Sequence, residues 1–360
     1  MTDAAAVRQR LTAWLAAQLP GAAGVRIDGL DRVELGHSAE TLLLTVAWRR
    51  GNHDHHEDVV VRIRPPAPGL LEPYDLKRQF DILRALEGTP VRAPRALWYE
   101  GSGEVLGREF YVMERRAGVV YERTLPEELA AAPDRIRRMS ESMVDQIAAI
   151  HNVDLHATGL DAIGDGRDYL DRELDHWEGE LRRVQRGPLP ALDRLVVELR
   201  RRRPEPCPRV TLVHGDPKHG NFAFVDDEVN AVFDWEMATV GDPLADLGWA
   251  EMLWNLPGSF TSLPGSLSAD ELVARHEALT GIVARNREWY RAFQLLKMTA
   301  IMFVGGMLFA AGHSDDVRLA DMAAGVPFFT RQALAELGVE DAPDPDPNPN
   351  PTSKMGSLRS

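Results

Sequence analysis

The pattern of apolar residues along the chain changes near Gly118. Before that residue, short runs rich in leucine and β-branched residues alternate with turns, and one amphipathic helical pattern interrupts them. The expected strands cover residues 40–48, 58–64, 97–100 and 110–114, and the expected helix covers residues 75–86. After Gly118, long patterns of helical period dominate, as in Met143, Ile147 and Ile150. This order predicts an α+β fold with a β-rich first part and a mainly helical second part.

The same change of pattern sets the expected domain organisation. A length of 360 residues corresponds to two or three domains or lobes. We expect an N-terminal lobe at residues 1–115, which begins with an amphipathic helix, and a C-terminal lobe at residues 116–336. Residues 337–360 run into repeated Pro, Asp and Asn, a composition that buries no core and predicts a disordered tail.

Cysteine content and hydropathy restrict the expected compartment. Cys207 is the single cysteine, so the chain has no intrachain disulfide and no thiolate zinc site. The first 19 residues place charges among apolar residues, unlike a signal peptide. The most apolar run, residues 298–312, is shorter than the roughly 20 residues of a bilayer span and predicts a buried core helix. We therefore expect a cytoplasmic protein without a membrane partner.

Charge gives a further restriction. The chain has 41 Lys+Arg and 55 Asp+Glu, a net charge of −14, which argues against a nucleic-acid partner. Residues 119–180 hold 15 acidic side chains against 6 arginines. This segment could attract a cationic small molecule, but ordinary solvated helix faces explain it equally simply and are the interpretation we favour. Oligomeric state is not indicated by the sequence.

Residues 213–247 carry the most unusual chemistry. A short strand ends at His214-Gly215-Asp216, a loop closes on Asn221, and a hairpin with an acidic turn follows, with Asp234 at its exit. The arrangement should present Asp216, Asn221 and Asp234 from adjacent strand ends into one small volume. Two carboxylates and an amide oxygen are hard ligands suited to Mg²⁺, which completes its coordination with phosphates and water.

The spacing H-x-D-x-x-x-x-N, then two hydrophobic residues and Asp, then G-D-P-x-x-D, resembles the aminoglycoside phosphotransferase family, whose fold is the bilobal fold of the protein kinases. The resemblance extends to about residue 336. It is stronger toward the branch related to the kinase-like domains fused to acyl-CoA dehydrogenases than toward dedicated antibiotic-resistance enzymes. It implies ATP and Mg²⁺ as cofactors, a nucleotide-covering sheet in the N-terminal lobe and an acceptor cleft in the C-terminal lobe.

The resemblance also implies roles for residues of the central segment. Asp216 would be the catalytic aspartate that takes the proton of the acceptor hydroxyl, and Asn221 and Asp234 would hold magnesium. Lys218 would lie near the transferred phosphoryl group, although a solvated loop lysine is an equal alternative. His214 and Asp246 would support the catalytic loop.

One more aspartate of this segment has a structural interpretation. Asp242, before Pro243, could support the site, but we favour a helix N-cap with proline in the first turn.

Nucleotide contacts are expected from two segments of the N-terminal lobe. Gly36 and Ser38 belong to the segment that would cover the phosphates, which contains a single glycine. Met113, Glu114 and Arg115 form the hinge against which adenine would lie.

The expected phosphate clamp departs from the family pattern at two positions. Arg62 stands where kinases place the lysine that contacts the α- and β-phosphates, and arginine can take this role because it stays cationic and binds phosphate bidentately. Gln79 stands where the family often has a glutamate, and glutamine can hydrogen-bond Arg62 but cannot neutralise it.

The resulting expectation is an ATP- and Mg²⁺-dependent phosphotransferase. It would transfer the γ-phosphoryl group to a hydroxyl of a small molecule, such as an aminoglycoside-like sugar, a hydroxyacyl-CoA or another hydroxylated metabolite. The preference between ATP and GTP stays open. The departures at Arg62 and Gln79 motivate one alternative to this expectation, which is a kinase-like binding protein without catalytic activity.

Overall fold

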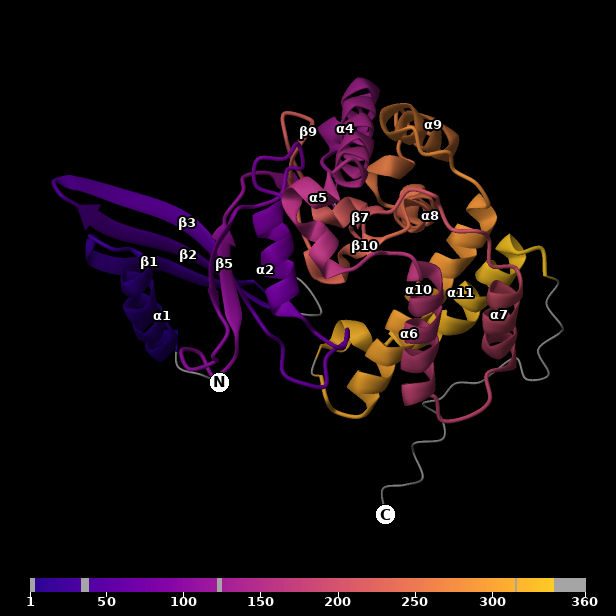
Figure 1. Cartoon of the computed structure of the whole chain (residues 1–360), viewed down its shortest axis with the longest axis horizontal. Helices are drawn as coiled ribbons and strands as arrows, with labels where there is room; N and C mark the ends of the chain where they lie inside the picture. The colour runs from indigo at the N-terminus through magenta and orange to yellow at the C-terminus, as the bar shows by residue number, and fades with distance from the viewer. Residues whose placement is uncertain (1–3, 34–38, 122–124, 315, 340–360) are drawn as a thin grey trace, which may run out of the picture. The chain divides into compact units, whose positions relative to one another are not determined.

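The structure is a computed structural model that describes residues 4–33, 39–121, 125–314 and 316–339. The chain divides into two compact units (Figure 1). The first comprises residues 1–167 and 207–284, and the second comprises residues 168–206 and 285–360. The predicted lobe boundaries at 115 and 336 follow a different division and stay predictions. Residues 340–360 of the predicted tail lie outside the described residues.

An antiparallel five-stranded sheet forms the N-terminal part of the first unit, in the order β1-β2-β3-β5-β4. Its strands are β1 (Ala23–Val33), β2 (Glu40–Arg50), β3 (His53–Ile63), β4 (Ala96–Glu100) and β5 (Phe110–Glu114). Helices α1 (Ala4–Gln18) and α2 (Leu76–Ala85) cover its two faces. Phe110 packs against Trp14 of α1, whereas its neighbour Tyr111 packs against Phe80 of α2. Because successive side chains of a strand point to opposite faces, the two helices lie on opposite sides of the sheet.

The rest of the first unit is built around two small sheets. One is β6-β8-β9 (Val119–Val120, Phe222–Val225, Glu228–Val232) and the other is β10-β7 (Thr239–Gly241, Thr211–Val213). The α-helices of this part are α3 (Glu127–Ala130), α4 (Pro133–His151), α5 (Leu155–Thr158), α8 (Pro243–Trp254) and α9 (Ala269–Thr280). Buried side chains of α4 and α8 pack beneath the strands that carry the candidate site. The residues of interest therefore emerge from short strands with a helical core behind them.

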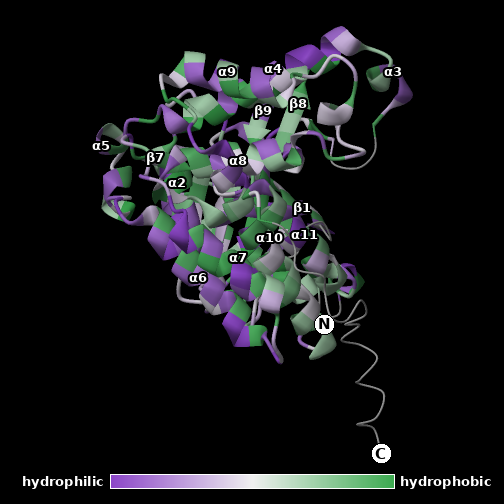
Figure 2. Cartoon of the chain, turned by 90° about the vertical axis from the view of Figure 1, so that its right-hand side faces the viewer, coloured by the Kyte–Doolittle hydropathy of each residue, from purple (hydrophilic) through white to green (hydrophobic). Residues whose placement is uncertain are grey.

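Among the residues that the structure describes, the α-helices of the second unit are α6 (Tyr169–Val184), α7 (Pro190–Arg201), α10 (Arg287–Ala310) and α11 (Val326–Glu336). Figure 2 shows the mixed hydrophilic and hydrophobic surface of α6. Among the described residues, only α10 is long and apolar enough to cross a membrane, and 67% of its most apolar window is buried inside the fold. It is the predicted core helix, but it is longer than the apolar run because it begins at Arg287.

The acidic segment 119–180 forms ion pairs on helix surfaces. Asp145 pairs with Arg275 at 2.6 Å, and Glu180 pairs with Arg183 at 2.6 Å. These pairs agree with the favoured interpretation of solvated helix faces.

The predicted α+β fold is confirmed, and two local expectations need correction. The first two predicted strands, 40–48 and 58–64, are too short, because β2 and β3 continue through the polar residues between them and leave only Gly51-Asn52 as the turn. A two-residue Gly-containing turn is what a tight hairpin favours. Strand β1 was not predicted, because irregular register between Ala23 and Gly29 breaks its alternation of polar and apolar residues.

The β8–β9 hairpin is fixed to α4 by one carboxylate. Asp226 and Asp227 of the turn both have positive φ, 50° and 67°. The Asp227 carboxylate is 8% exposed and accepts hydrogen bonds from Arg135 and Arg138 of α4 at 2.9 and 2.7 Å. The hydrogen bond from Arg135 has the largest effect on the pKa of the Asp227 carboxyl, and together with the bond from Arg138 it lowers that pKa. Since the hairpin leads into Asp234, this attachment also fixes the entry to the candidate site.

We predict that Asp227→Asn lowers the free energy of unfolding by about 1 kcal/mol, because it removes the charge while Asn still tolerates positive φ. Denaturant unfolding measures the loss. Asp226→Asn is the matched control at an exposed position of the same turn and should change the free energy of unfolding by less than about 0.5 kcal/mol. Equal effects of both substitutions would contradict the assigned role of Asp227.

Candidate active site

A buried carboxylate fixes the loop that follows β7. Asp246 of α8, 1% exposed, accepts hydrogen bonds from the backbone N–H groups of His214 at 2.6 Å and Gly215 at 2.8 Å. Gly215 has φ +83°, and a Cβ there would lie 2.6 Å from the backbone oxygen of Met237. Only glycine fits this position without strain. Asp246, for which a supporting role was predicted, therefore contacts the backbone of the loop directly.

The His214 ring connects the two halves of the site. Its Nε2 lies 2.8 Å from the Phe233 carbonyl oxygen, and its Nδ1 lies 3.2 Å from the Asp216 N–H. Since a carbonyl only accepts and an N–H only donates, Nε2 carries the proton and Nδ1 accepts. The neutral ring thereby joins the backbone of Asp216 to the residue that precedes Asp234.

Asp216 is 6% exposed and is held by its own loop. Its Oδ2 accepts a hydrogen bond from Asn221 Nδ2 at 3.0 Å and forms an ion pair with Lys218 at 2.9 Å. Asn221 Nδ2 also donates to the Asp216 carbonyl at 2.8 Å. Oδ1 of Asp216 is buried and has no hydrogen-bond partner among the described residues. The carboxylate is thus fixed through one oxygen, and the other is left without a hydrogen-bond partner among the described residues.

Asp234 leaves β9 in the left-handed conformation, with φ 66° and ψ 60°. The Phe233 N–H donates to the Asn221 carbonyl at 2.8 Å, which places Asp234 next to the Asp216 loop. Its side chain is 28% exposed, and Arg62 of β3 donates to its Oδ1 at 3.4 Å. The structure thus gathers Asp216, Asn221 and Asp234 at neighbouring strand ends and adds Arg62 from the five-stranded sheet.

Asp234 and Glu236 balance the charge of Arg62, which Gln79 cannot do. Its guanidinium donates to Thr41 Oγ1 at 3.1 Å and forms ion pairs with Asp234 and with Glu236 Oε2, the latter at 3.9 Å. Burial lowers the pKa of Arg62, but nearby Tyr74 and the carboxylates outweigh it and raise the pKa above its usual value.

The hydrogen bond that Gln79 could make to Arg62 is not formed among the described residues. Gln79 is 1% exposed and its Nε2 has no partner there. Sequence reasoning missed Glu236 because it searched for the partner on α2. The acidic residue two positions after Asp234 was the available signal.

The predicted hinge lies at the end of β5. The Glu114 N–H donates to the Arg95 carbonyl at 2.9 Å, and the Arg115 N–H donates to the Asp58 carbonyl at 3.1 Å. Burial raises the pKa of the Glu114 carboxyl, but hydrogen bonds from Arg95 and the charge of Arg116 lower it below its usual value. The adenine-binding roles of Met113, Glu114 and Arg115 stay predictions. Gly36 and Ser38 lie outside the described residues.

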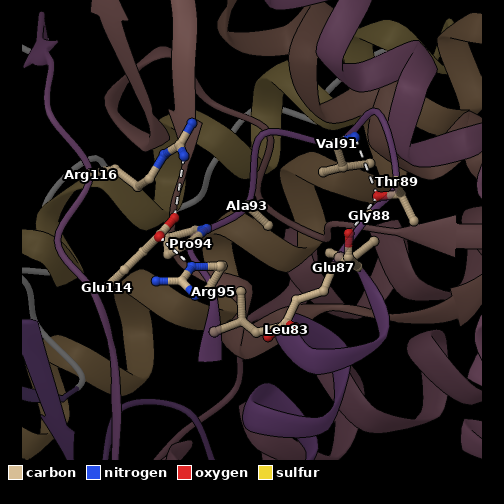
Figure 3. Close-up of a pocket in the computed structure, with 11 residues that line it drawn as sticks. Leu83, Glu87, Gly88, Thr89, Val91, Ala93, Pro94, Arg95, Glu114 and Arg116 are labelled. Carbon is tan, nitrogen blue, oxygen red and sulfur yellow. Dashed lines mark hydrogen bonds and ion pairs between the residues drawn. The ribbon is translucent and has the colours of Figure 1, made fainter. Parts of the chain in front are cut away.

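A cavity of about 350 Å³ lies beside this strand end (Figure 3). Leu83 and Val91 contribute apolar lining, and Arg95, Glu114 and Arg116 contribute charge. In Figure 3 both arginines point toward the Glu114 carboxylate. The cavity contains none of Asp216, Asn221 and Asp234, so it is separate from the candidate chemistry.

Asp242 caps α8 as predicted. Its Oδ1 accepts from Leu244 N–H and its Oδ2 from Cys207 N–H, both at 2.9 Å, and Pro243 follows in the first turn. Asp242 thus fixes the start of the helix that carries Asp246.

Two buried histidines extend the support behind Asp246. His151 of α4 contacts Asp246 Oδ2 through Nε2 at 3.2 Å and His276 of α9 through Nδ1 at 2.8 Å. Burial raises the pKa of the Asp246 carboxyl, but the hydrogen bond to His151 and nearby charge lower it below its usual value. Burial, with His151 as the second cause, lowers the pKa of His276 to about 3.

The lowered pKa of His276 makes the free energy of unfolding depend on pH. Between pH 6.5 and 3 the unfolded chain binds a proton at His276 that the folded chain does not, so the free energy of unfolding falls as the pH falls. We predict a loss of about 1.6 kcal/mol from this group between pH 6.5 and 5. His276→Gln keeps a donor at the Nε2 position without titrating, and should flatten the dependence in denaturant unfolding at the two pH values.

His156→Gln is the control. His156 is exposed, and its hydrogen bond to Asp161 raises its pKa, so its contribution to stability is present at low pH and is lost as the pH rises. The His156→Gln variant should not reduce the fall in the free energy of unfolding between pH 6.5 and 5. A His276→Gln chain that loses as much stability as the unaltered chain would contradict the assignment.

The chain belongs to the phosphotransferase enzyme family, whose model matches residues 32–293. Acyl-CoA dehydrogenase family member 10 of Mus musculus is 33% identical over 258 residues, 70% of this chain and 23% of that protein. Acyl-CoA dehydrogenase family member 11 of Rattus norvegicus is 32% identical over 201 residues, 55% of this chain and 25% of that protein. The matches span about a quarter of the length of these relatives.

Solved structures agree with the fold. A crystal structure of a candidate aminoglycoside phosphotransferase from Ralstonia eutropha superposes with a TM-score of 0.74 at 23% identity, covering 92% of this chain and 98% of that one. A thermostable mutant of aminoglycoside phosphotransferase APH(4)-Ia, solved with AMP-PNP and hygromycin B, gives 0.59 at 17% identity over 93% and 98%. At these identities the similarity establishes the kinase-like fold alone.

Proposed function

We propose that this protein is an ATP- and Mg²⁺-dependent phosphotransferase that transfers the γ-phosphoryl group to a hydroxyl of a small molecule. The observation that carries the proposal is the Asp216 carboxylate, held through Oδ2 by Asn221 and Lys218 while its buried Oδ1 has no partner among the described residues. A carboxylate held in this way can accept the proton of an acceptor hydroxyl and orient its oxygen for attack. The expected cytoplasmic location is part of the proposal.

Asn221 and Asp234 fit a magnesium site. The two hydrogen bonds from Asn221 Nδ2 to Asp216 fix the amide, so its oxygen is the atom that remains for a metal. Asp234 supplies a partly exposed carboxylate beside it. These are hard oxygen donors, and too few for an all-protein cage, as is usual for Mg²⁺ bound with phosphates. When bound, the ion would neutralise charge on the phosphate oxygens.

Arg62 would bind the nucleotide phosphates with its planar guanidinium. Its side chain is 15% exposed and its charge is balanced by Asp234 and Glu236, so the cation is already oriented toward the metal-binding segment. Lys218, beside Asp216, would contact the transferred phosphoryl group. Positioning and charge neutralisation would provide most of the rate enhancement.

The acceptor is proposed only as a class. APH(4)-Ia was solved with hygromycin B, and another structure of this fold, at 18% identity and a TM-score of 0.57, is a macrolide 2'-phosphotransferase. Sequence relatives are instead acyl-CoA dehydrogenase family members. A screen should therefore include aminoglycosides, macrolides and hydroxyacyl-CoAs, with ADP formation as the measurement.

We predict that Asp216→Asn lowers phosphoryl transfer by about 100-fold or more, because the general base is lost, while ATP binding is kept. Acceptor-dependent ADP formation measures transfer, and equilibrium dialysis measures ATP binding. Asp226→Asn, in the exposed hairpin turn, is the matched control and should keep full activity. Equal activity of Asp216→Asn and the unaltered protein would show that the catalytic assignment is wrong.

We predict that Asp234→Ala abolishes the Mg²⁺-dependent stabilisation by ATP. Ligand binding to the folded chain should raise the melting temperature of the unaltered protein by a few degrees at ATP concentrations roughly 100 times Kd. The variant should show no such rise with MgATP. If ATP with Mg²⁺ stabilises neither protein, the proposed ATP-dependent phosphotransfer is contradicted, and the alternative of a non-catalytic binding protein gains support.

A further inference from the structure

We infer that Glu236 is a positioning residue, which shares the Arg62 guanidinium with Asp234 and provides it with a second carboxylate partner when Asp234 binds a metal. The inference rests on the proposed function and deepens it. It assigns to the segment Asp234-Trp235-Glu236 the charge-balancing role that the family pattern places on the helix after β3.

The contacts of Arg62 show two competing carboxylates. Arg62 Nη2 lies 3.4 Å from Asp234 Oδ1 and 3.9 Å from Glu236 Oε2, while Nη1 donates to Thr41 Oγ1 at 3.1 Å. Asp234 is the proposed metal ligand, so its carboxylate cannot serve both the guanidinium and a divalent cation at full strength. A second carboxylate at the same guanidinium provides an alternative partner.

Glu236 is itself fixed by α2 and the turn before it. The Tyr74 hydroxyl donates to Glu236 Oε2 at 3.1 Å, and Arg78 Nη2 donates to the Glu236 carbonyl oxygen at 3.3 Å. The Glu236 side chain is 9% exposed and Tyr74 is 4% exposed. A buried carboxylate with a tyrosine donor has a defined direction, as a positioning group requires.

Gln79 explains why this carboxylate is needed. It lies on the buried face of α2 and carries no charge, so it does not neutralise a buried arginine. With Gln79 neutral, Glu236 provides the negative charge from a different element. The two departures from the family pattern, arginine at 62 and glutamine at 79, are therefore parts of one arrangement.

A double-mutant cycle on Arg62→Met and Glu236→Gln tests the inference. The measurement is the Mg²⁺ concentration that gives half-maximal ATP binding, obtained by equilibrium dialysis at fixed ATP. Glu236→Gln alone should raise that concentration by roughly five- to tenfold, because Arg62 then relies on Asp234 and competes with the metal. In the Arg62→Met background, Glu236→Gln should change it by less than about twofold.

A persistent effect of Glu236→Gln in the Arg62→Met background would overturn the inference, because Glu236 would then act on the metal directly. No effect in either background would overturn it as well. If the unaltered protein does not bind ATP with Mg²⁺, the proposed function fails first and this inference fails with it, and the result on the unaltered protein separates the two cases.

One further variant and one control pair keep the test decisive. Should Glu236→Gln not fold, Tyr74→Phe removes only the hydroxyl that directs Glu236, and its smaller effect on the Mg²⁺ requirement must also disappear in the Arg62→Met background. The control pair is Arg64→Met and Glu109→Gln, an ion pair of 2.7 Å beside the same sheet. This pair should leave the Mg²⁺ requirement unchanged.

Discussion

The candidate site depends on one buried carboxylate that accepts two backbone N–H groups. Asp246 holds the N–H groups of His214 and Gly215, which would otherwise be buried without partners at the end of β7. A charge buried to this degree is stable only with such donors and with His151 at its second side. The loop that carries Asp216 thus takes its shape from a residue on α8, and α8 takes its position from the Asp242 cap.

Charge balance around Arg62 is the second constraint. A buried guanidinium needs opposite charge, and the chain supplies it from the metal-binding segment rather than from α2. In kinases the equivalent lysine pairs with a glutamate on the helix, so helix movement controls the clamp. Here Arg78 of α2 and Tyr74 of the turn before α2 contact Glu236.

The sequence predicted those parts of the molecule that local spacing determines. Asp216, Asn221 and Asp234 follow short strands at fixed separations, so their proximity can be read from the chain, as can the Asp242 cap before Pro243. Glu236 is visible in the sequence as an acidic residue after Asp234, but its pairing with Arg62 is not, because 174 positions separate the two residues and only tertiary packing brings them together. The length of the β2–β3 hairpin escaped prediction for a related reason, since its polar residues are exposed on paired strands rather than in a turn.

The imidazole of His214 has a consequence for the dimensions of the site. Both ring nitrogens are used, one by the Asp216 N–H and the other by the Phe233 carbonyl. The separation between the base-carrying loop and the strand end before Asp234 is therefore set by the width of one rigid aromatic ring. Such a spacer has no rotatable bonds between its two contacts, so the two sides of the site are kept at a fixed distance even when the surrounding side chains change rotamer.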